Sequence, residues 1–555
     1  MKRPVPGQVF VWSLFLAGWV MACWSLFSIP QFLDDAFITF RAAENLADGR
    51  GASFNPGERV QTCTTPLYVL LLAGGRRVTG WHTDRFELAV EFVALSAILF
   101  LLWKLGRRLK FSRSWALLLP LFVLVQPSEL QAVKGMEALA FTALILACLL
   151  AESRNRGALC GVLLGLVAST RTEGILVSLA YALYWLAGRL VYGPKSFRAA
   201  DLARRAAWAV AVGLCFLLFV TTHYDSLIPN SVWAKRLQSA AGWQSVRSAW
   251  RDYLVGRPPW VSAWGLLLGV GVVATGVACF APRPLTAAPP PGSVPAGRRG
   301  LLASPLAALR RNRHLYRTLG FLCAICILHG GFFVATRAPG GYSWYTFPEK
   351  VLMAPLYALS LAALWHARHG RHRSPTGGRA AWPRWAAGTV FAVLVAYLAA
   401  TRLLFVAHGI LTTHANGDLV ANDKGYTRIG RWLAAEAPRG WSFAGAEIGI
   451  LGYYSGLKCY DLAGIVTPAS LSAFTREPLS QIVLRYRTEV YVTDFFEELV
   501  ESSPRYDAQV ARQFGETYAL IDRRGHAWGE TRVYCRRDAV QWIGTGGGSA
   551  EDVAH

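Results

Sequence analysis

Charged side chains are scarce in this sequence, at 16% of its 555 residues. Soluble globular domains carry about 25% charged residues. The hydrophobic share of 53% departs from a soluble domain in the same direction. This composition excludes an ordinary soluble globular protein and indicates a membrane protein.

Acidic residues are especially few, with 34 Asp and Glu against 57 Lys and Arg, so the formal net charge is +23. A nucleic-acid-binding protein usually gathers such an excess on one domain or face. Here the basic residues fall in short clusters between apolar runs, as the positive-inside rule describes. The charge therefore reports membrane topology, and we expect no nucleic-acid partner.

The sequence also lacks the motifs of nucleotide and metal chemistry. It has no P-loop, and the glycines at 161 and 165 lie inside an apolar run rather than in a dinucleotide fingerprint. His and Glu recur at no metal-ligand spacing, and Cys323 and Cys326 lie within an apolar run. We therefore expect no divalent metal, no resident cofactor and no nucleotide-sugar donor.

Long apolar runs dominate what is present. The run from Val9 to Ile29 follows Lys2 and Arg3, is long enough to span, and is interpreted as a retained signal anchor. Further apolar runs bring the total to about eleven spans; they centre near residues 95, 120, 143, 164, 181, 213, 269, 326, 357 and 395. Every second loop is basic and is assigned to the cytoplasm. The outer loops are then 31–85, 126–136, 170–174, 223–258, 337–349 and the chain after about 407.

The pattern predicts a polytopic α-helical membrane domain over residues 1–406, which includes the first outer loop 31–85 and a basic cytoplasmic linker 281–317. A strand and a turn over 441–452, strands at 490–493 and 532–535, and a helix at 427–436 predict a small extracytoplasmic α/β domain over 407–543. The Gly-rich segment 544–555 is a flexible tail by composition. Cys459 and Cys535 lie in this outer domain, where a disulfide between them would be allowed.

The first outer loop contains two expected juxtamembrane helices. Residues 36–47 have an apolar and a polar face, with Asp34 or Asp35 as N-cap and Gly49 at the end. Residues 66–73 form an apolar stretch that is too short to span. Both helices are expected to lie at the membrane surface.

Asp34 and Asp35 are the candidate catalytic groups of this loop. Carboxylates beside an apolar span are costly to place there, which makes them a functional hypothesis. Two close carboxylates also raise one pKa, which suits a general base. The alternative for the pair is helix capping at the interface.

Polar residues of the outer loops are candidates for binding a donor phosphate or substrate. The set comprises Arg41, Lys134, Glu137, Arg171, Glu173, His223, Asn230, Lys235, Tyr342 and Trp344. Simpler alternatives remain open for several of them. Arg171 can pair locally with Glu173, Lys134 can snorkel at the start of a span, and Tyr342 and Trp344 suit either an interfacial aromatic belt or sugar stacking.

Several of these motifs resemble those of bacterial GT-C glycosyltransferases, most closely the mycobacterial terminal β-(1→2)-arabinofuranosyltransferase group. The matching segments are Asp34–Gly49, Phe54–Val60, Thr64–Leu67, Gly135–Glu137, Thr170–Gly174, Pro229–Lys235 and Glu447–Gly464. The resemblance implies an Asp of the first-loop pair as catalytic base and Arg171 and Lys235 near the donor phosphate. It also implies a decaprenyl- or undecaprenyl-phosphate sugar as donor. The sequence departs from the group at Phe37, at Cys63 and at 65–68, which bears on the identity of the sugar or acceptor.

The resulting hypothesis is a multi-pass plasma-membrane enzyme that transfers a sugar, arabinofuranose or another pentose or hexose, from a polyprenyl-phosphate donor. The acceptor would be a cell-envelope glycan or glycolipid on the outer face. The alternatives are a transporter or flippase of lipid-linked sugars and a non-catalytic envelope scaffold. A transporter favours midplane charges and repeated halves. The sequence places its charges at the outer rim and shows no internal repeat, which favours the enzyme.

Overall fold

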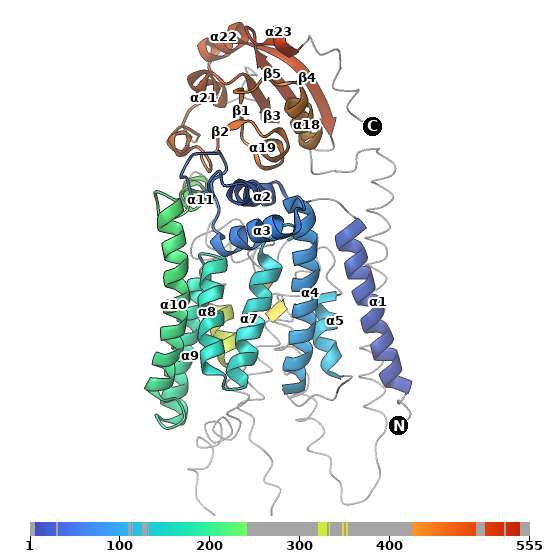
Figure 1. The fold of residues 1–555 in the computed structure, drawn as a ribbon, viewed down its shortest axis with the longest axis vertical. Helices are drawn as coiled ribbons and strands as arrows, with labels where there is room; N and C mark the ends of the chain where they lie inside the picture. The colour runs from blue at the N-terminus through green and yellow to red at the C-terminus, as the bar shows by residue number, and fades with distance from the viewer. Residues whose placement is uncertain are drawn as a thin grey trace, which may run out of the picture.

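The computed structural model has three layers, which Figure 1 shows from bottom to top: upright helices, two helices lying across them, and an α/β domain. The structure describes residues 6–28, 32–108, 113, 115–124, 130, 133–240, 320–329, 332, 347–348, 351–352, 425–474, 476–494, 506–526 and 529–543. The predicted linker 281–317, the tail 544–555, and the predicted spans near 269, 357 and 395 lie outside these residues.

The upright helices form where the apolar runs were predicted. Their bounds are α1 Pro6–Ser28, α4 Thr83–Arg108, η1 Trp115–Leu117, α5 Leu118–Leu124, α7 Ala138–Ser153, α8 Gly157–Thr170, α9 Gly174–Tyr192 and α10 Ala199–His223. A further apolar helix covers Gly320–His329. Among the described residues, α4 and α10 are long and apolar enough to cross a bilayer. The apolar stretches of the other helices are shorter over their described residues. The described part of the run near 120 is the short pair η1 and α5.

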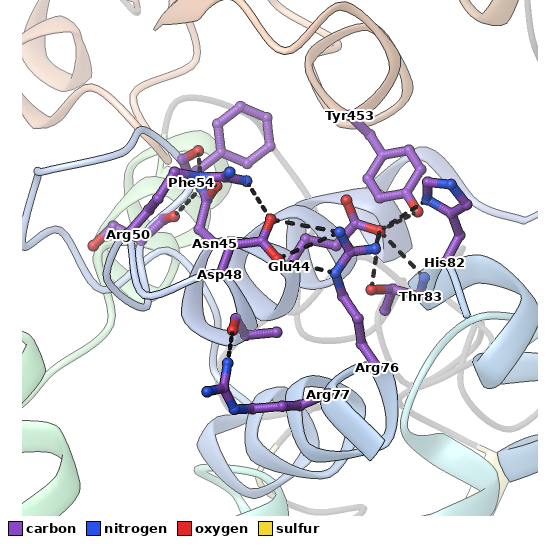
Figure 2. A network of polar contacts seen from close by, with 12 residues as sticks. Glu44, Asn45, Asp48, Arg50, Phe54, Arg76, Arg77, His82, Thr83 and Tyr453 are labelled. Carbon is purple, nitrogen blue, oxygen red and sulfur yellow. Dashed lines mark hydrogen bonds and ion pairs between the residues drawn. The ribbon is translucent and has the colours of Figure 1, made fainter. Parts of the chain in front are cut away.

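The two lying helices are α2 Asp34–Ala47 and α3 Pro66–Thr79. Both predicted helices are thus present, but α3 extends six residues past the predicted end at 73, until Gly80 adopts a left-handed φ of 71°. Its last turn is held because Arg76 pairs with Glu44 at 2.9 Å and Arg77 donates to the carbonyl of Ala47 at 3.0 Å. Figure 2 shows these contacts between α2 and α3.

The C-terminal domain is a five-stranded sheet with helices on both faces. Its strands are β1 Ser442–Gly445, β2 Lys458–Asp461, β3 Val490–Thr493, β4 Tyr518–His526 and β5 Gly529–Arg536, in the order β2-β1-β3-β5-β4. Strands β2, β1 and β3 are parallel, and β5 and β4 are antiparallel to their neighbours. The helices are α18 Tyr426–Glu436, α19 Gly449–Ser455, α20 Leu471–Phe474, α21 Leu479–Tyr486, α22 Ala508–Thr517 and α23 Val540–Ile543, with the short η2 Pro468–Ser470. The predicted helix 427–436 and the three predicted strands are confirmed as α18, β1, β3 and β5.

Alternation along the strands assigns the two faces of this sheet. Phe443 packs with α18 and α19 in a core that continues into α2 and α3, whereas its neighbour Ala444 packs with α21 and α22. The outer domain and the lying helices therefore share one hydrophobic core rather than meeting at a wet surface.

The disulfide considered for Cys459 and Cys535 is wrong. Both thiols are free and buried. Cys459 lies on β2 and Cys535 on β5, with β1 and β3 between them. Three strand spacings of about 4.8 Å separate the residues by about 14 Å, whereas a disulfide needs Cα atoms within roughly 7 Å.

Helix α2 holds α19 at both of its ends. The two carboxylate oxygens of Asp34 accept from the backbone N–H groups of Gly449 at 2.9 Å and Ile450 at 2.8 Å. The guanidinium of Arg41 donates to the carbonyls of Gly452 and Leu457, the second at 2.6 Å. A carboxylate thus meets the positive N-terminal end of α19 and a cation meets its negative C-terminal end.

This arrangement corrects two predictions. Asp34 does not cap its own helix, since the N-cap of α2 is Leu33 and α2 has no side-chain cap. Instead it satisfies orphan N–H groups of a helix more than 400 residues away in the chain. Arg41, predicted to bind substrate, is buried in this contact and stacks over the ring of Phe54 at 4.4 Å.

Glycines on α19 allow the two helices to approach this closely. A Cβ at Gly452 would lie 2.5 Å from Cζ of Phe54 and 2.7 Å from Nη1 of Arg41, and one at Gly449 would overlap the Asp34 carbonyl. Both distances are far below van der Waals contact, so the residues need to be glycine for steric reasons.

We predict that Gly452→Ala lowers the thermal midpoint of the purified protein and increases protease cleavage around α18 and α19. Overpacking of this kind costs about 1–3 kcal/mol. The matched control is Gly515→Ala in α22, where a Cβ meets nothing within 4 Å. That change should be neutral or slightly stabilising because Ala is the better helix former. Equal effects of the two substitutions would contradict the close-approach argument.

Candidate active site

Two outer loops that are separate in the sequence meet at the end of the bundle beneath α2. Arg171, which follows α8, lies between Glu137 before α7 and Glu173 before α9. Its Nη1 is 2.6 Å from Glu137, and its Nε donates to Glu173 at 2.8 Å. All three side chains are buried. The ion-pair alternative for Arg171 and Glu173 is therefore correct, and Glu137 is a second partner.

The pKa values of the two carboxylates shift in opposite directions overall, although Arg171 lowers both. Burial raises the pKa of Glu137 above its ordinary value, and Arg171 offsets only part of that effect. For Glu173 burial acts in the same direction, but Arg171 and His329 outweigh it and lower the pKa to about 2. Glu173 is thus the firmly ionised partner of Arg171.

His329 joins this group without having been predicted from the sequence. It ends the helix Gly320–His329, is buried, and packs its ring 6.1 Å from that of Phe141. In the sequence, His329 appears only as one histidine at the edge of an apolar run. Such a position is ordinary, so only the fold reveals its proximity to Glu173.

Asp35, in the first turn of α2, and Glu137 both act electrostatically on Cys63. The charges of Glu137 and Asp35 both add to the effect of burial, which raises the pKa of the Cys63 thiol to about 11. Lys235 on α11 (Asn230–Ala240) acts on Glu137 in the opposite sense and favours its ionised form. Asp35, Glu137, Arg171 and Lys235 are therefore electrostatically coupled around one region.

Asp35 differs from Asp34 in what its carboxylate contacts. Asp34 accepts two backbone N–H groups of α19. Asp35 is half-buried, and within the described ranges its carboxylate makes no hydrogen bond or ion pair. Asp34 therefore has a structural contact that Asp35 lacks.

The remaining predicted site residues lie elsewhere or serve the domain contact. Asn230 donates to the carbonyls of Gly464 and Ile465, the second at 2.9 Å, so it holds the outer domain instead of lining the region near Asp35. His223 ends α10, and its ring lies 4.5 Å from that of Phe219. Tyr342 and Trp344 lie outside the described residues.

Lys134 is buried behind α2 rather than snorkelling to the surface. Its Nζ lies 5.1 Å from the centre of the Phe32 ring. Burial lowers the pKa of Lys134 to about 8, although the nearby Glu91 opposes this. The adjacent N–H of Gly135 donates to Glu91, which ties this loop to α4.

A second network fixes the orientation of α2, and Figure 2 shows it. Oε1 of Glu44 accepts from Arg76 at 2.9 Å, from the Tyr453 hydroxyl at 2.9 Å and from the N–H of Thr83 at 3.2 Å. One carboxylate thus connects α2 with α3, α4 and α19. The sequence pattern predicted only that Glu44 lies on the polar face of this helix.

Asn55 provides another fixed contact with the outer domain. Its side-chain amide donates to the carbonyl of Cys459 at 2.9 Å and accepts from the N–H of the same residue at 2.9 Å. It thereby pairs with the free edge of β2 as a neighbouring strand would. Within the described parts of the chain, no group of three or more His, Cys, Asp or Glu side chains is arranged to hold a metal ion.

Comparison with known proteins identifies the architecture. ArnT from Cupriavidus metallidurans, solved with bound undecaprenyl phosphate, superimposes with a TM-score of 0.53 at 12% identity, over 95% of this chain and 97% of ArnT. The chain has the GT-C fold. This likeness supports the GT-C fold that the sequence motifs predicted.

Two further proteins are similar to this GT-C chain. The terminal beta-(1->2)-arabinofuranosyltransferase of Mycobacterium tuberculosis (strain ATCC 25618 / H37Rv) is 27% identical over 249 residues, which are 41% of this chain and 38% of that protein. The chain thus matches well under half of that relative's length. The archaeal oligosaccharyltransferase AglB from Archaeoglobus fulgidus aligns at 11% identity, over 96% of this chain and 74% of AglB, with a TM-score of 0.48. The prediction of a glycosyltransferase agrees with the partial match to the arabinofuranosyltransferase.

The outer domain of the GT-C chain has its own match. Residues 415–543 match a family described as Domain of unknown function (DUF8728). This range covers the sheet and the helices that pack on it, and it includes both α19 and the loop held by Asn230.

We predict a pH-dependent contribution of Asp34 to domain docking. Burial raises its pKa from 3.8 to about 7, although the N–H groups of Ile450 and Gly449 oppose the shift. The docked state therefore keeps the proton to higher pH than the unfolded state. The stabilisation is full below about pH 4, declines as the pH rises, and is lost above about pH 7.

Thermal midpoints of wild type, Asp34→Asn and the control Asp48→Asn between pH 5 and 8 measure this effect. The difference between wild type and Asp34→Asn should shrink as the pH rises and level off above 7. Asp48 immediately follows the same helix and pairs with Arg50 at 2.9 Å and with Arg76 at 3.4 Å, so its replacement controls for the loss of an acidic side chain beside α2. A difference for Asp34→Asn that stays constant with pH would contradict the assignment.

Proposed function

We propose that the protein transfers a sugar from a polyprenyl-phosphate carrier to a glycan or glycolipid of the cell envelope, with Asp35 as general base. The GT-C fold and the undecaprenyl phosphate bound to ArnT support the class of donor. The partial match to an arabinofuranosyltransferase supports a sugar of the pentofuranose kind. The basic clusters at the opposite end of the bundle support an active site on the outer face of the plasma membrane.

The contrast between Asp34 and Asp35 carries this proposal. A general base needs a carboxylate that is held in place yet can accept a proton. Asp34 is engaged by two N–H groups of α19, so both of its oxygens are already used in the domain contact. Asp35 is on the same rigid helix turn, half-buried, with its carboxylate uncommitted among the described residues.

The reaction follows from these positions. The hydroxyl of the acceptor gives its proton to the Asp35 carboxylate as its oxygen forms a bond to the anomeric carbon. The bond between that carbon and the phosphate oxygen breaks, and polyprenyl phosphate leaves with the electron pair. A single displacement of this kind inverts the configuration at the anomeric carbon.

A cation is needed where negative charge grows on the leaving phosphate. Arg171 is already shared between Glu137 and Glu173, which makes it a poor candidate for direct contact. Lys235 is half-buried, lies on α11 and acts electrostatically on Glu137. We assign the phosphate to Lys235, with Arg171 as the residue that positions Glu137 beside it.

The outer domain has a positioning role in this scheme. Asn230, the first residue of α11, is tied to the loop after β2. Five residues later the same helix presents Lys235. The docking of the outer domain therefore fixes the position of Lys235 relative to Asp35.

We predict that Asp35→Asn abolishes transfer while leaving the protein folded. Loss of a general base lowers the rate by about 10²–10⁴-fold. Asp34→Asn should instead lower the thermal midpoint and retain measurable transfer under conditions in which the protein remains folded. The measurement is transfer by purified protein from a panel of short-chain polyprenyl-phosphate pentoses and hexoses.

Asp225→Asn is the matched control, because this exposed outer-loop carboxylate pairs with Arg59 at the surface. It should leave the rate unchanged. Full activity of Asp35→Asn would overturn the assignment of the base. Movement of lipid-linked sugars across vesicles by a wild type that transfers none of them would favour the transporter alternative instead.

A further inference from the structure

The helix bundle has a cationic cavity at the end opposite the outer domain. Its volume is about 640 Å³. Five of its lining residues are cations and none is a carboxylate; these cations are Lys104, Arg107, Arg108, Arg113 and Arg154. They come from the end of α4, the segment after it, and the turn between α7 and α8. Three separate segments therefore direct positive charge toward one space.

The position of the cavity corresponds to a membrane interface. Thr83 begins α4 beside the Glu44 network, and Lys104 follows 21 residues later on the same helix. At 1.5 Å per residue this places the cavity roughly 30 Å from the network, which is about the thickness of a bilayer's hydrocarbon core. The cavity thus lies at the headgroup level of the other leaflet.

Local ion pairing does not account for three of these five cations. Within the described ranges, no carboxylate lies within ion-pair distance of Lys104, Arg113 or Arg154, and Arg108 donates to the neutral carbonyl of Ser153 at 2.8 Å. Lys104 lies over the rings of Phe100 and Trp103, at 5.1 and 5.0 Å. The positive-inside rule explains why cations occur at this end, but not why they converge on one cavity.

Two tryptophans complete the lining and indicate a lipid. Trp103 contributes an indole N–H that is buried and has no acceptor among the described residues. Trp12 belongs to α1, whose residues Leu16 and Val20 continue the same apolar surface, each more than half exposed. An acidic headgroup would supply an acceptor and negative charge, while its chains would run along α1.

We propose that this cavity binds the phosphate-bearing headgroup of an anionic glycerophospholipid. The shared chemistry is a phosphate ester, which a soluble phosphorylated compound also carries. The apolar surface of α1 beside the cavity favours the lipid source. Basic pockets between helices on the cytoplasmic side are suited to such headgroups.

Native mass spectrometry of the detergent-purified full chain tests the proposal. Phosphatidylglycerol is titrated against phosphatidylcholine, and glycerol 3-phosphate is the soluble arm. Wild type should retain phosphatidylglycerol preferentially. Each cation near an anionic headgroup contributes roughly a five-fold factor in affinity, so Arg113→Gln with Arg154→Gln should weaken retention by about 25-fold.

The control is Lys195→Gln with Arg198→Gln, which removes the same charge from two exposed residues of the turn between α9 and α10. It should change retention by less than two-fold. Trp103→Phe keeps the ring but removes the N–H, and should weaken retention several-fold even if the double substitution impairs folding.

Three results would overturn the proposal. Equal retention of the two lipids would show that the headgroup charge is not recognised. Equal losses in the cavity and control variants would indicate a general surface effect. Displacement of phosphatidylglycerol by equimolar glycerol 3-phosphate would identify a site for soluble phosphate compounds rather than for lipid.

Discussion

The contact between α2 and α19 is the constraint on which the rest of this structure depends. Asp34 meets the amide end of α19 and Arg41 meets its carbonyl end, so two charges of opposite sign match one helix dipole. Charge–dipole contacts of this kind contribute about 0.3–1 kcal/mol each at a surface and up to about 2 kcal/mol when partly buried. Glycines at the contact surface let the charged groups reach the backbone. The α/β domain is thereby placed over the lying helices in one register.

Other contacts become possible because this one exists. Tyr453, on the same short helix, reaches Glu44, and Asn55 pairs with the edge of β2. Each is a buried polar contact that would be costly to leave unsatisfied. Together they bind α2, the element that carries Asp35, from the bundle below and from the domain above.

The structural charged groups and the proposed reactive group differ in whether they are paired. Arg171 is held by two carboxylates, and removal of one partner of a buried ion pair costs about 3–5 kcal/mol. Such groups are rigid and poorly suited to exchange protons with a substrate. In the proposed mechanism the reactive carboxylate is Asp35. It lies on the fixed helix α2, but its carboxylate makes no ion pair among the described residues. The two interfaces of the bundle also differ: mixed charges gather near α2, and the charged residues that line the cavity at the far end are all cations.

The sequence by itself determined the elements and the class of protein. Apolar runs of sufficient length specify helices whatever their neighbours, because a hydrocarbon environment requires backbone groups to be satisfied within the segment. The first-loop residues from Asp34 to Leu67 were enough to indicate the GT-C superfamily, and the strands β1, β3 and β5 followed from local alternation. Local pattern also placed Asp34 and Asp35 in a functional loop.

Only the tertiary structure decided what each of these residues does. Asp34, Arg41 and Asn230 were candidates for catalysis or binding, and all three contact backbone groups of the outer domain, from 234 to more than 400 residues away in the chain. The free thiols of Cys459 and Cys535, and the approach of His329 to Glu173, depend likewise on strand order and helix packing. Partners so distant in the chain leave no periodic signal, since a hydrogen bond to a backbone amide or carbonyl requires no particular side chain on the other side.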